Sequence, residues 1–269
     1  MRVPFVKMHG LGNDFIVLDA RDAALPTLGA ATVRALADRR EGIGCDQLIL
    51  LEQDDAADCR MRIYNRDGGE VEACGNATRA VGLLIGKPAV IATAGGVLEV
   101  RPEDGGIAVD MGAPRFEWDA IPLAYPMDTL SMPVGWESLE RPAAVNVGNP
   151  HVVFFVEDND AVRLDSLGPQ IEMDELFPDK INVNVATVED RKTLRLRVWE
   201  RGAGLTRACG TGACATAVVA MRRDLVDREV EVHLPGGKLS IAWGEDDRIT
   251  MTGPAVEAYR GSFEWDDYT

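Results

Sequence analysis

The sequence repeats itself at a separation of 135 residues (195 minus 60). The segment RMRIYNRDGGEVEACG (60–75) aligns without gaps on RLRVWERGAGLTRACG (195–210). Seven of the sixteen positions are identical, where chance would give about one. A second pair, GLGNDFIVLD (10–19) and NVGNPHVVFF (146–155), follows in the same order at a separation of 136 (146 minus 10). A duplicated unit of ordinary domain size explains both matches.

The duplication predicts two related domains. We expect them at residues 1–116 and 117–254, with the C-terminal segment 255–269 a candidate to return to the first domain. The stretch 114–142 holds five prolines and little periodicity, so it is predicted to be a linker.

Each half is predicted to contain many short strands and one central helix. Runs such as DFIVLD and RMRIYN in the first half, and HVVFFVE and LRLRVWE in the second, are typical of strands. After Cys74 the apolar residues recur at helical spacing from Ala77 to Ile85, and the helix should end near Gly86. The counterpart GACATAVVAM is apolar nearly all round, which indicates a buried helix. The expected fold class is α+β, with two pseudo-symmetric domains that each wrap a curved, mostly antiparallel sheet around a central helix.

Composition limits the classes of partner and the cellular compartment that we expect for this protein. The formal net charge of -16 and the pI near 4.6 argue against nucleic acid or an anionic membrane as a partner, since both need clustered Lys and Arg. The chain shows no signal-peptide pattern and no apolar run of membrane-spanning length. We therefore expect a cytoplasmic protein that acts on a small molecule, with its five cysteines as thiols rather than a disulfide framework.

The two repeated cysteines, Cys74 and Cys209, are each expected at the N-terminus of a central helix. Unpaired backbone N–H groups and the helix dipole favour a thiolate there and can hold a carboxylate. Gly75 and Gly210 follow directly and let a ligand approach the backbone. One such site would suggest a nucleophilic enzyme. Two equivalent sites meeting at one cleft suit proton exchange at a carbon, where a thiolate takes a proton from one face and a thiol delivers one to the other.

Packing is the competing explanation, because a buried cysteine commonly behaves as a small hydrophobe. The repetition favours chemistry for the two repeated cysteines, whereas Cys45, Cys59 and Cys214 are interpreted as packing residues. The spacing of Cys209 and Cys214 matches no zinc site, and no metal is expected. His151 lies in the repeated Gly–Asn segment and is a candidate functional histidine.

Four motifs are specific when taken together: KMHGLGNDF (7–15), YNRDGGEVEACGN (64–76), NVGNPH (146–151) and WERGAGLTRACGTGACA (199–215). They closely resemble those of diaminopimelate epimerases, and the likeness spans the chain. The resemblance implies the pseudo-symmetric two-domain fold. It also implies a cofactor-independent isomerase that interconverts LL- and meso-2,6-diaminopimelate in lysine and peptidoglycan-precursor biosynthesis, with Cys74 and Cys209 as base and acid. A homodimer is a candidate assembly.

The resemblance also implies which residues hold the substrate. His151 and Glu200 are expected as a polar pair near the thiols. Backbone amides of Gly75–Asn76 and Gly210–Thr211 are expected to hold the carboxylate at the reacting centre. Substrate-binding side chains are expected at six further positions, the last of which could grip a carboxylate with its guanidinium: Asn13, Gln47, Asn65, Asn149, Asn182 and Arg201. Amides suit this substrate because they donate to its carboxylates and accept from its ammonium groups without adding charge.

Other functions remain open at this stage. Proline racemases use paired cysteines on a similar fold, and phenazine-pathway isomerases share the fold without the thiol pair. A redox sensor would instead join Cys74 and Cys209 in a regulatory disulfide. A pyridoxal enzyme ranks last, because the five lysines lie in no recognisable cofactor context.

Overall fold

The computed structural model describes residues 1–72 and 74–268, which form two compact units. Unit 1 contains Met1–Val109 and the C-terminal segment from Gly253 onward, and unit 2 contains Asp110–Thr252. The boundaries expected from the sequence, 116/117 and 254/255, stay a prediction of where the duplicated domains end. No helix in the described part of the chain is long and apolar enough to cross a membrane.

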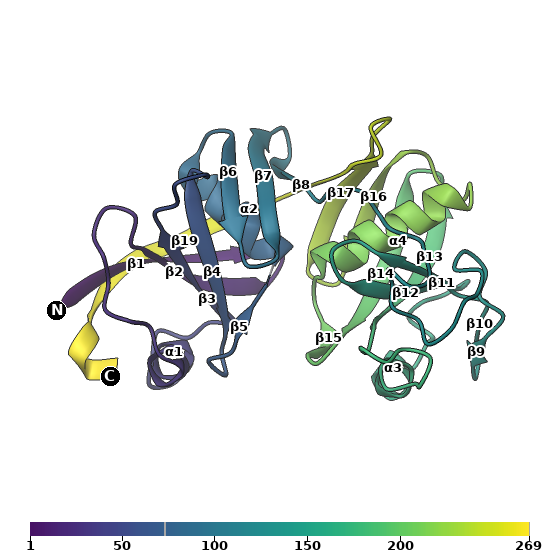
Figure 1. Cartoon of the computed structure of the whole chain (residues 1–269), viewed down its shortest axis with the longest axis horizontal. Helices are drawn as coiled ribbons and strands as arrows, with labels where there is room; N and C mark the ends of the chain where they lie inside the picture. The colour runs from purple at the N-terminus through teal and green to yellow at the C-terminus, as the bar shows by residue number, and fades with distance from the viewer. Residues whose placement is uncertain (73, 269) are drawn as a thin grey trace. The chain divides into compact units, whose positions relative to one another are not determined.

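Unit 1 is a mixed sheet with two helices and a terminal 3-10 turn. Its strands are β1 (Arg2–Gly10), β2 (Asn13–Asp19), β3 (Gln47–Glu52), β4 (Cys59–Asn65), β5 (Glu70–Val71), β6 (Ala89–Thr93), β7 (Gly96–Glu103), β8 (Gly106–Asp110) and β19 (Val256–Glu264). The helical elements are α1 (Ala30–Ala37), α2 (Gly75–Ile85) and η1 (Trp265–Tyr268). The C-terminal strand β19 pairs antiparallel with β1, so the two ends of the chain run side by side (Figure 1).

After an added hairpin, unit 2 repeats the order of elements that unit 1 has from β1 to β8. Its strands are β9 (Gly135–Trp136), β10 (Leu139–Glu140), β11 (Ala143–Asn146), β12 (Pro150–Phe155), β13 (Asn182–Asp190), β14 (Thr193–Glu200), β15 (Gly204–Thr206), β16 (Glu229–Leu234), β17 (Gly237–Trp243) and β18 (Ile249–Gly253). Its helices are α3 (Leu164–Glu172) and α4 (Gly210–Arg222). Figure 1 shows α4 crossing the middle of the unit, where it contacts strands from β11 to β17.

The strand pairing confirms the expected fold class and the duplication behind it. In unit 1, β2 pairs parallel with β3 and β3 pairs antiparallel with β4; in unit 2, β12 pairs parallel with β13 and β13 pairs antiparallel with β14. Phe15 lies opposite Gln47 in unit 1, and His151 lies opposite Asn182 in unit 2. Most pairs are antiparallel, as expected. The parallel pairs β2–β3 and β12–β13 arise because the connection between their strands is long and carries a helix, α1 or α3.

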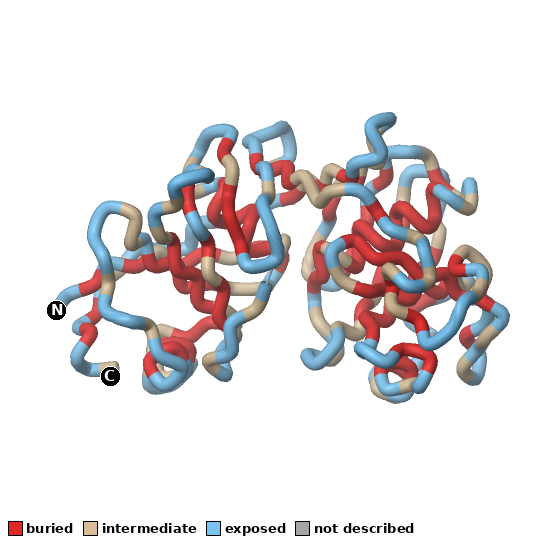
Figure 2. The backbone as a smooth tube through the Cα atoms, in the orientation of Figure 1, coloured by how far each residue is buried: buried red, intermediate tan, exposed pale blue. Residues whose placement is uncertain are grey.

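Burial places each central helix inside its unit. Every residue of α4 from Gly212 to Met221 is buried, in agreement with its all-round apolar sequence. Helix α2 ends at Gly86, whose φ of 72° is the left-handed conformation favoured at a helix C-terminus. Figure 2 shows buried residues filling the middle of each unit, while the loops are exposed.

The predicted linker at 114–142 is wrong. Ile121, Leu123, Met132 and Leu139 are all buried in the hydrophobic core of unit 2. The same stretch includes the β9–β10 hairpin. Prolines interrupt its periodicity, but its scattered apolar side chains still pack on α3 and its neighbouring strands, which local sequence patterns do not reveal.

Candidate active site

The predicted site residues lie where the central strands and the central helix of each unit begin or end. In unit 1 these positions are the starts of β2 and β3, the end of β4 and the start of α2. Because β2 and β3 are parallel and β4 is antiparallel to β3, the two starts and the end meet at one edge of the sheet. That edge holds Asn13, Gln47, Asn65, Cys74, Gly75 and Asn76. Unit 2 repeats the arrangement with Asn149, His151, Asn182, Glu200, Arg201, Cys209, Gly210 and Thr211.

Cys74 is the N-cap residue of α2, as the sequence predicted. Its Sγ lies 3.9 Å from the side-chain Oδ1 of Asn13. The buried Asn76 follows within the first helical turn. Its Oδ1 accepts a hydrogen bond of 2.7 Å from the guanidinium of Arg79, which is fully buried inside α2. Arg79 therefore holds the side chain of Asn76 in one orientation.

A cluster of charged side chains orients the side-chain amide of Asn13. Asp46 Oδ2 accepts hydrogen bonds from the Asn13 side-chain amide at 3.3 Å and from the Asp14 backbone at 3.2 Å. Lys7 and Arg39 both bond to the Asp14 carboxylate, and Arg39 also bonds to Asp46. Burial raises the pKa of Asp14, but the hydrogen bonds from Arg39 and Lys7 outweigh it and hold that pKa well below its usual range. A carboxylate only accepts, so Asp46 turns the Asn13 amide nitrogen toward itself and the Asn13 oxygen toward Cys74.

Gln47 and Asn65 lie opposite each other on β3 and β4. The Gln47 side-chain Nε2 donates to Asn65 Oδ1 at 3.0 Å. Among the described residues, the buried Gln47 Oε1 has no hydrogen-bond partner. A buried acceptor without a partner is costly, so this oxygen is suited to receive a donor from a ligand.

Cys209 is the N-cap residue of α4 and is only 4% exposed. Its Sγ accepts the Gly212 backbone N–H at 3.3 Å and lies 3.5 Å from Thr211 Oγ1. Burial raises the pKa of the Cys209 thiol well above 9.0, and the negative charge of Glu200 raises it further. The Glu200 carboxylate lies near this thiol, and burial raises its own pKa. The expected bias toward thiolate is therefore reversed here, because burial outweighs the helix N-terminus.

His151 is fully buried at the start of β12. Its Nε2 lies 2.8 Å from Asn149 Oδ1, and its Nδ1 lies 3.1 Å from Asn184 Nδ2. Burial lowers the pKa of the imidazole from 6.5 to about 3. His151 is therefore neutral in this arrangement.

Asn182 and Arg201 are joined through the main chain. Asn182 Oδ1 accepts the Arg201 backbone N–H at 2.9 Å, and Asn182 Nδ2 donates to the Pro150 carbonyl at 2.8 Å. The Arg201 guanidinium donates to the Asp179 carbonyl at 2.9 Å and lies on the exposed side. Both polar atoms of the Asn182 side chain therefore bond to the main chain at the neighbouring strand ends. That Asn182 binds substrate stays a prediction.

Sequence reasoning missed three residues that orient predicted ones: Asp46, Arg79 and Asn184. Each carried a local signal. Asp46 directly precedes Gln47, and Arg79 is the one charged residue of α2. Asn184 follows Asn182 by two residues on a strand, so both side chains leave the same face.

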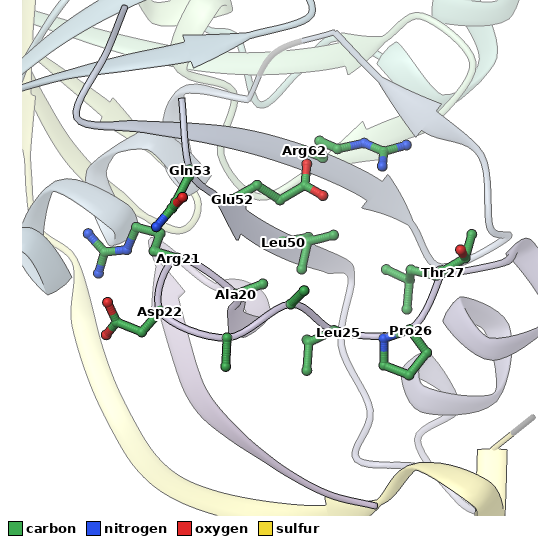
Figure 3. Close-up of a pocket in the computed structure, with 13 residues that line it drawn as sticks. Ala20, Arg21, Asp22, Leu25, Pro26, Thr27, Leu50, Glu52, Gln53 and Arg62 are labelled. Atoms are coloured by element: carbon green, nitrogen blue, oxygen red, sulfur yellow. The ribbon is translucent and has the colours of Figure 1, made fainter. Parts of the chain in front are cut away.

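A separate surface pocket of about 430 Å³ lies within unit 1 (Figure 3). Residues 20–28 form one wall, and Leu50 and Glu52 of β3 with Arg62 of β4 form the other. Figure 3 shows Arg21 and Arg62 at opposite ends of an apolar middle. Both guanidiniums are already paired, with Asp19 and Glu70 respectively. The pocket contains none of the predicted site residues.

Within residues 1–72 and 74–268, no three His, Cys, Asp or Glu side chains are placed to hold a metal ion. The polar groups of the predicted site residues in each unit are instead hydrogen-bond donors, acceptors and thiols. Such a set can bind an amino acid and move protons.

Known proteins resemble this chain over its full length. The sequence model of the family described as "Diaminopimelate epimerase" matches residues 5–117 and 143–257. The diaminopimelate epimerase of Erythrobacter litoralis is 68% identical, with 100% of both chains covered. That of Rhizorhabdus wittichii is 65% identical, covering 96% of this chain and 94% of the relative.

Solved structures share the fold at low identity. A phenazine biosynthesis protein of the PhzF family from Enterococcus faecalis aligns with a TM-score of 0.73 at 14% identity, covering 98% of this chain and 100% of the other. A hydroxyproline epimerase from Agrobacterium vitis, with bound trans-4-hydroxy-L-proline, aligns with a TM-score of 0.66 at 14% identity, covering 97% and 92%. These likenesses establish the fold. The match of the family model and the identity of the relatives go further: this chain belongs to the diaminopimelate epimerase family.

Proposed function

We propose that this chain interconverts LL- and meso-2,6-diaminopimelate by removing the proton from one face of an α-carbon and delivering another to the opposite face, with Cys74 and Cys209 as the acid–base pair and without a cofactor. Family membership supports the reaction, which is that of an amino-acid isomerase. One observation supports the assignment of the thiols above all others. Each duplicated unit places a cysteine as the N-cap of its central helix, at equivalent positions.

The chemistry balances with one thiolate, one thiol and one proton transfer at each step. A thiolate removes the α-proton and becomes a thiol, and the electron pair stays on the carbon beside the carboxylate. The other thiol gives its proton to the opposite face of that carbon and becomes a thiolate. The configuration is inverted, and the pair is ready for the reverse reaction.

The start of each central helix supplies the stabilisation that this step needs. Backbone N–H groups of the first turns, at Gly75–Asn76 and Gly210–Thr211, hold the α-carboxylate and oppose the negative charge that develops as the proton leaves. Because this negative charge develops only as the weakly acidic α-proton leaves, the backbone N–H groups contribute more to the rate than to ground-state binding.

The structure indicates the starting protonation state of Cys209. Burial and the Glu200 carboxylate keep Cys209 protonated. Cys209 therefore serves as the proton donor for the isomer that enters while Cys74 is the thiolate. The roles exchange after each turnover.

The remaining predicted residues bind the rest of the substrate. Asn13 lies beside Cys74, Asn149 is its counterpart in the repeated segment of unit 2, and Gln47 offers its buried Oε1. Asn65, Asn182 and Arg201 hold the distal amino-acid end, with the exposed guanidinium of Arg201 gripping a carboxylate.

The test uses the reduced protein without added cofactor. LL-diaminopimelate is incubated in heavy water, and loss of the α-proton signal and appearance of the meso isomer are followed by NMR. Exchange with inversion is the expected result, and Cys74→Ala and Cys209→Ala should each abolish it while the thermal unfolding temperature changes little. Full activity in either variant would refute the two-thiol scheme.

Two control experiments separate the alternatives. Proline as substrate tests the racemase reading, and turnover of proline in place of diaminopimelate would favour it. Activity that vanishes on mild oxidation and returns with a thiol reductant would show that the two cysteines can pair, without making the protein a sensor.

A homodimer that works in the cytoplasm is the accompanying proposal, supported by the biosynthetic role of the family. Light scattering on the purified protein and cell fractionation test it.

A further inference from the structure

Asn184 stands out because it is a fully buried polar residue that the proposed function does not use. It lies on β13, two residues after Asn182, and is not one of the predicted substrate-binding residues. Its Nδ2 donates to the Val152 carbonyl at 2.9 Å and faces His151 Nδ1 at 3.1 Å.

The contacts of Asn184 decide which way its amide points. If the amide were rotated by half a turn, its oxygen would face the Val152 carbonyl oxygen at hydrogen-bond distance, and two acceptors would repel. The nitrogen is therefore the atom that faces Val152 and His151. An amide nitrogen only donates, so His151 Nδ1 must be the acceptor and carries no proton.

The proton of the neutral imidazole then lies on Nε2. That nitrogen is 2.8 Å from Asn149 Oδ1, which accepts it. The Asn149 amide is turned in consequence, with its oxygen toward His151 and its nitrogen away from it. Among the described residues, no hydrogen bond takes the Asn149 Nδ2 group, and Asn149 is only half-buried.

The other end of the Asn184 amide reaches the turn that carries Cys209. A Cβ on Gly212 would lie 2.7 Å from Asn184 Oδ1, closer than real Cβ contacts. Gly212 is also the residue whose backbone N–H bonds to Cys209 Sγ. Asn184 thus bonds to His151, and its Oδ1 lies beside Gly212 in the first turn of α4.

We propose that Asn184 is a positioning residue: it fixes His151 as the Nε2–H tautomer, so that Asn149 presents its amide N–H groups to a carboxylate of the amino-acid substrate. This inference rests on the proposed function for the identity of the substrate, but the tautomer itself does not depend on it. His151 is then a neutral relay that orients Asn149. It does not accept the substrate proton, because its one basic nitrogen is already occupied by Asn184.

The equivalent asparagine of unit 1 is oriented by a different device. Asn13 is turned by the Asp46 carboxylate, whereas Asn149 is turned by a buried imidazole. The two asparagines consequently expose opposite atoms, oxygen toward Cys74 in unit 1 and nitrogen outward in unit 2. This difference fits a substrate whose groups around the reacting carbon are unlike.

The first measurement is the tautomer of His151 in the wild-type protein, read from the imidazole nitrogen shifts in long-range proton–nitrogen NMR spectra. His9→Gln and His233→Gln assign the signals by elimination, since the chain has 3 histidines. The expected result is one neutral Nε2–H form at every pH from about 5 to 9, in line with the lowered pKa. An Nδ1–H form or a protonated ring would overturn the inference, whether or not the protein epimerises diaminopimelate.

The second measurement uses Asn184→Asp, which keeps the shape but replaces the donor with an acceptor. His151 should then carry a proton on Nδ1, and kcat/KM for diaminopimelate should fall by about tenfold or more, mainly through KM, because one oriented hydrogen bond to the carboxylate is lost. The matched control is Asn159→Asp, which also buries a carboxylate in unit 2 in place of a fully buried asparagine. It should leave both the tautomer and KM unchanged. Wild-type kcat/KM in Asn184→Asp would refute the positioning role.

Discussion

The protonation of Cys209 can be changed by removing a single charge. In Glu200→Gln the side chain keeps its shape but loses the negative charge that raises the pKa of the Cys209 thiol. Because a neighbouring negative charge disfavours a thiolate, its removal should lower the pKa of Cys209. Burial, the larger cause of the raised pKa, is unaffected by this substitution.

The size of the effect follows from Coulomb's law. Two unit charges about 4 Å apart interact by about 4 kcal/mol at an effective dielectric constant of about 20. Glu200 is only partly shielded from water, and solvent screening reduces the interaction to about 2 kcal/mol. The ratio of thiolate to thiol at Cys209 should therefore rise by about thirtyfold at any fixed pH.

Ultraviolet absorbance of the thiolate during a pH titration measures this ratio directly. The titration is done in a Cys74→Ser background, and Glu200→Gln with Cys209→Ser supplies the baseline. Cys45 and Cys59 interfere little, since burial raises the pKa of Cys45 to about 12 and also raises that of Cys59, and the baseline variant subtracts any contribution of Cys214.

Glu172→Gln is the matched control. Glu172 is a buried carboxylate of the same unit that binds Trp199 Nε1 at 2.7 Å and the Gly202 backbone at 3.0 Å. Its loss should not change the titration of Cys209. If Glu200→Gln leaves the Cys209 midpoint unchanged or moves it upward, the argument from charge is wrong.

Three further variants test other parts of the structure. Asp14→Asn should lower the free energy of unfolding at pH 7 by about 2 kcal/mol in urea titrations, since it removes charged hydrogen bonds from Arg39. Because the folded pKa of Asp14 lies below its unfolded value, the wild-type advantage is complete above about pH 4 and should shrink as the pH falls below that; an equal gap at pH 3 would contradict this. Gly212→Ala should destabilise unit 2 by about 1–3 kcal/mol in the same assay, because the new methyl lies 2.7 Å from the buried Asn184 oxygen, and a neutral effect would contradict the packing. His151→Gln should keep kcat within about tenfold of wild type, because its amide can still donate an N–H; a loss as large as that expected for the cysteine variants would show that the imidazole itself moves protons.

The fold was predictable from the sequence because the same structural unit occurs twice along the chain. Matching segments at one offset revealed the duplication, and the apolar residues of α4 revealed a buried helix. The linker prediction failed at Ile121 and Met132, where isolated apolar residues join the core of unit 2 through long-range packing. Local periodicity carries no record of such contacts.

The candidate site was predictable only in part. Residue types at matched positions pointed to Cys74 and Cys209, and the family resemblance supplied the polar residues around them. The orienting groups were missed, because Asp46, Arg79 and Asn184 act on other side chains. Their roles depend on which atoms face one another after folding, and composition and spacing do not contain that information.

By itself, the sequence determined the duplicated unit, the fold class and the place of a cysteine at the start of each central helix. These follow from periodicity and repetition, which are properties of neighbouring residues along the chain. Only the tertiary structure decided the chemical state of the groups: burial and the Glu200 charge raise the pKa of Cys209, and full burial lowers the pKa of His151. Proton affinity depends on burial and on the charges and donors that surround a group, and residues distant in the sequence supply them.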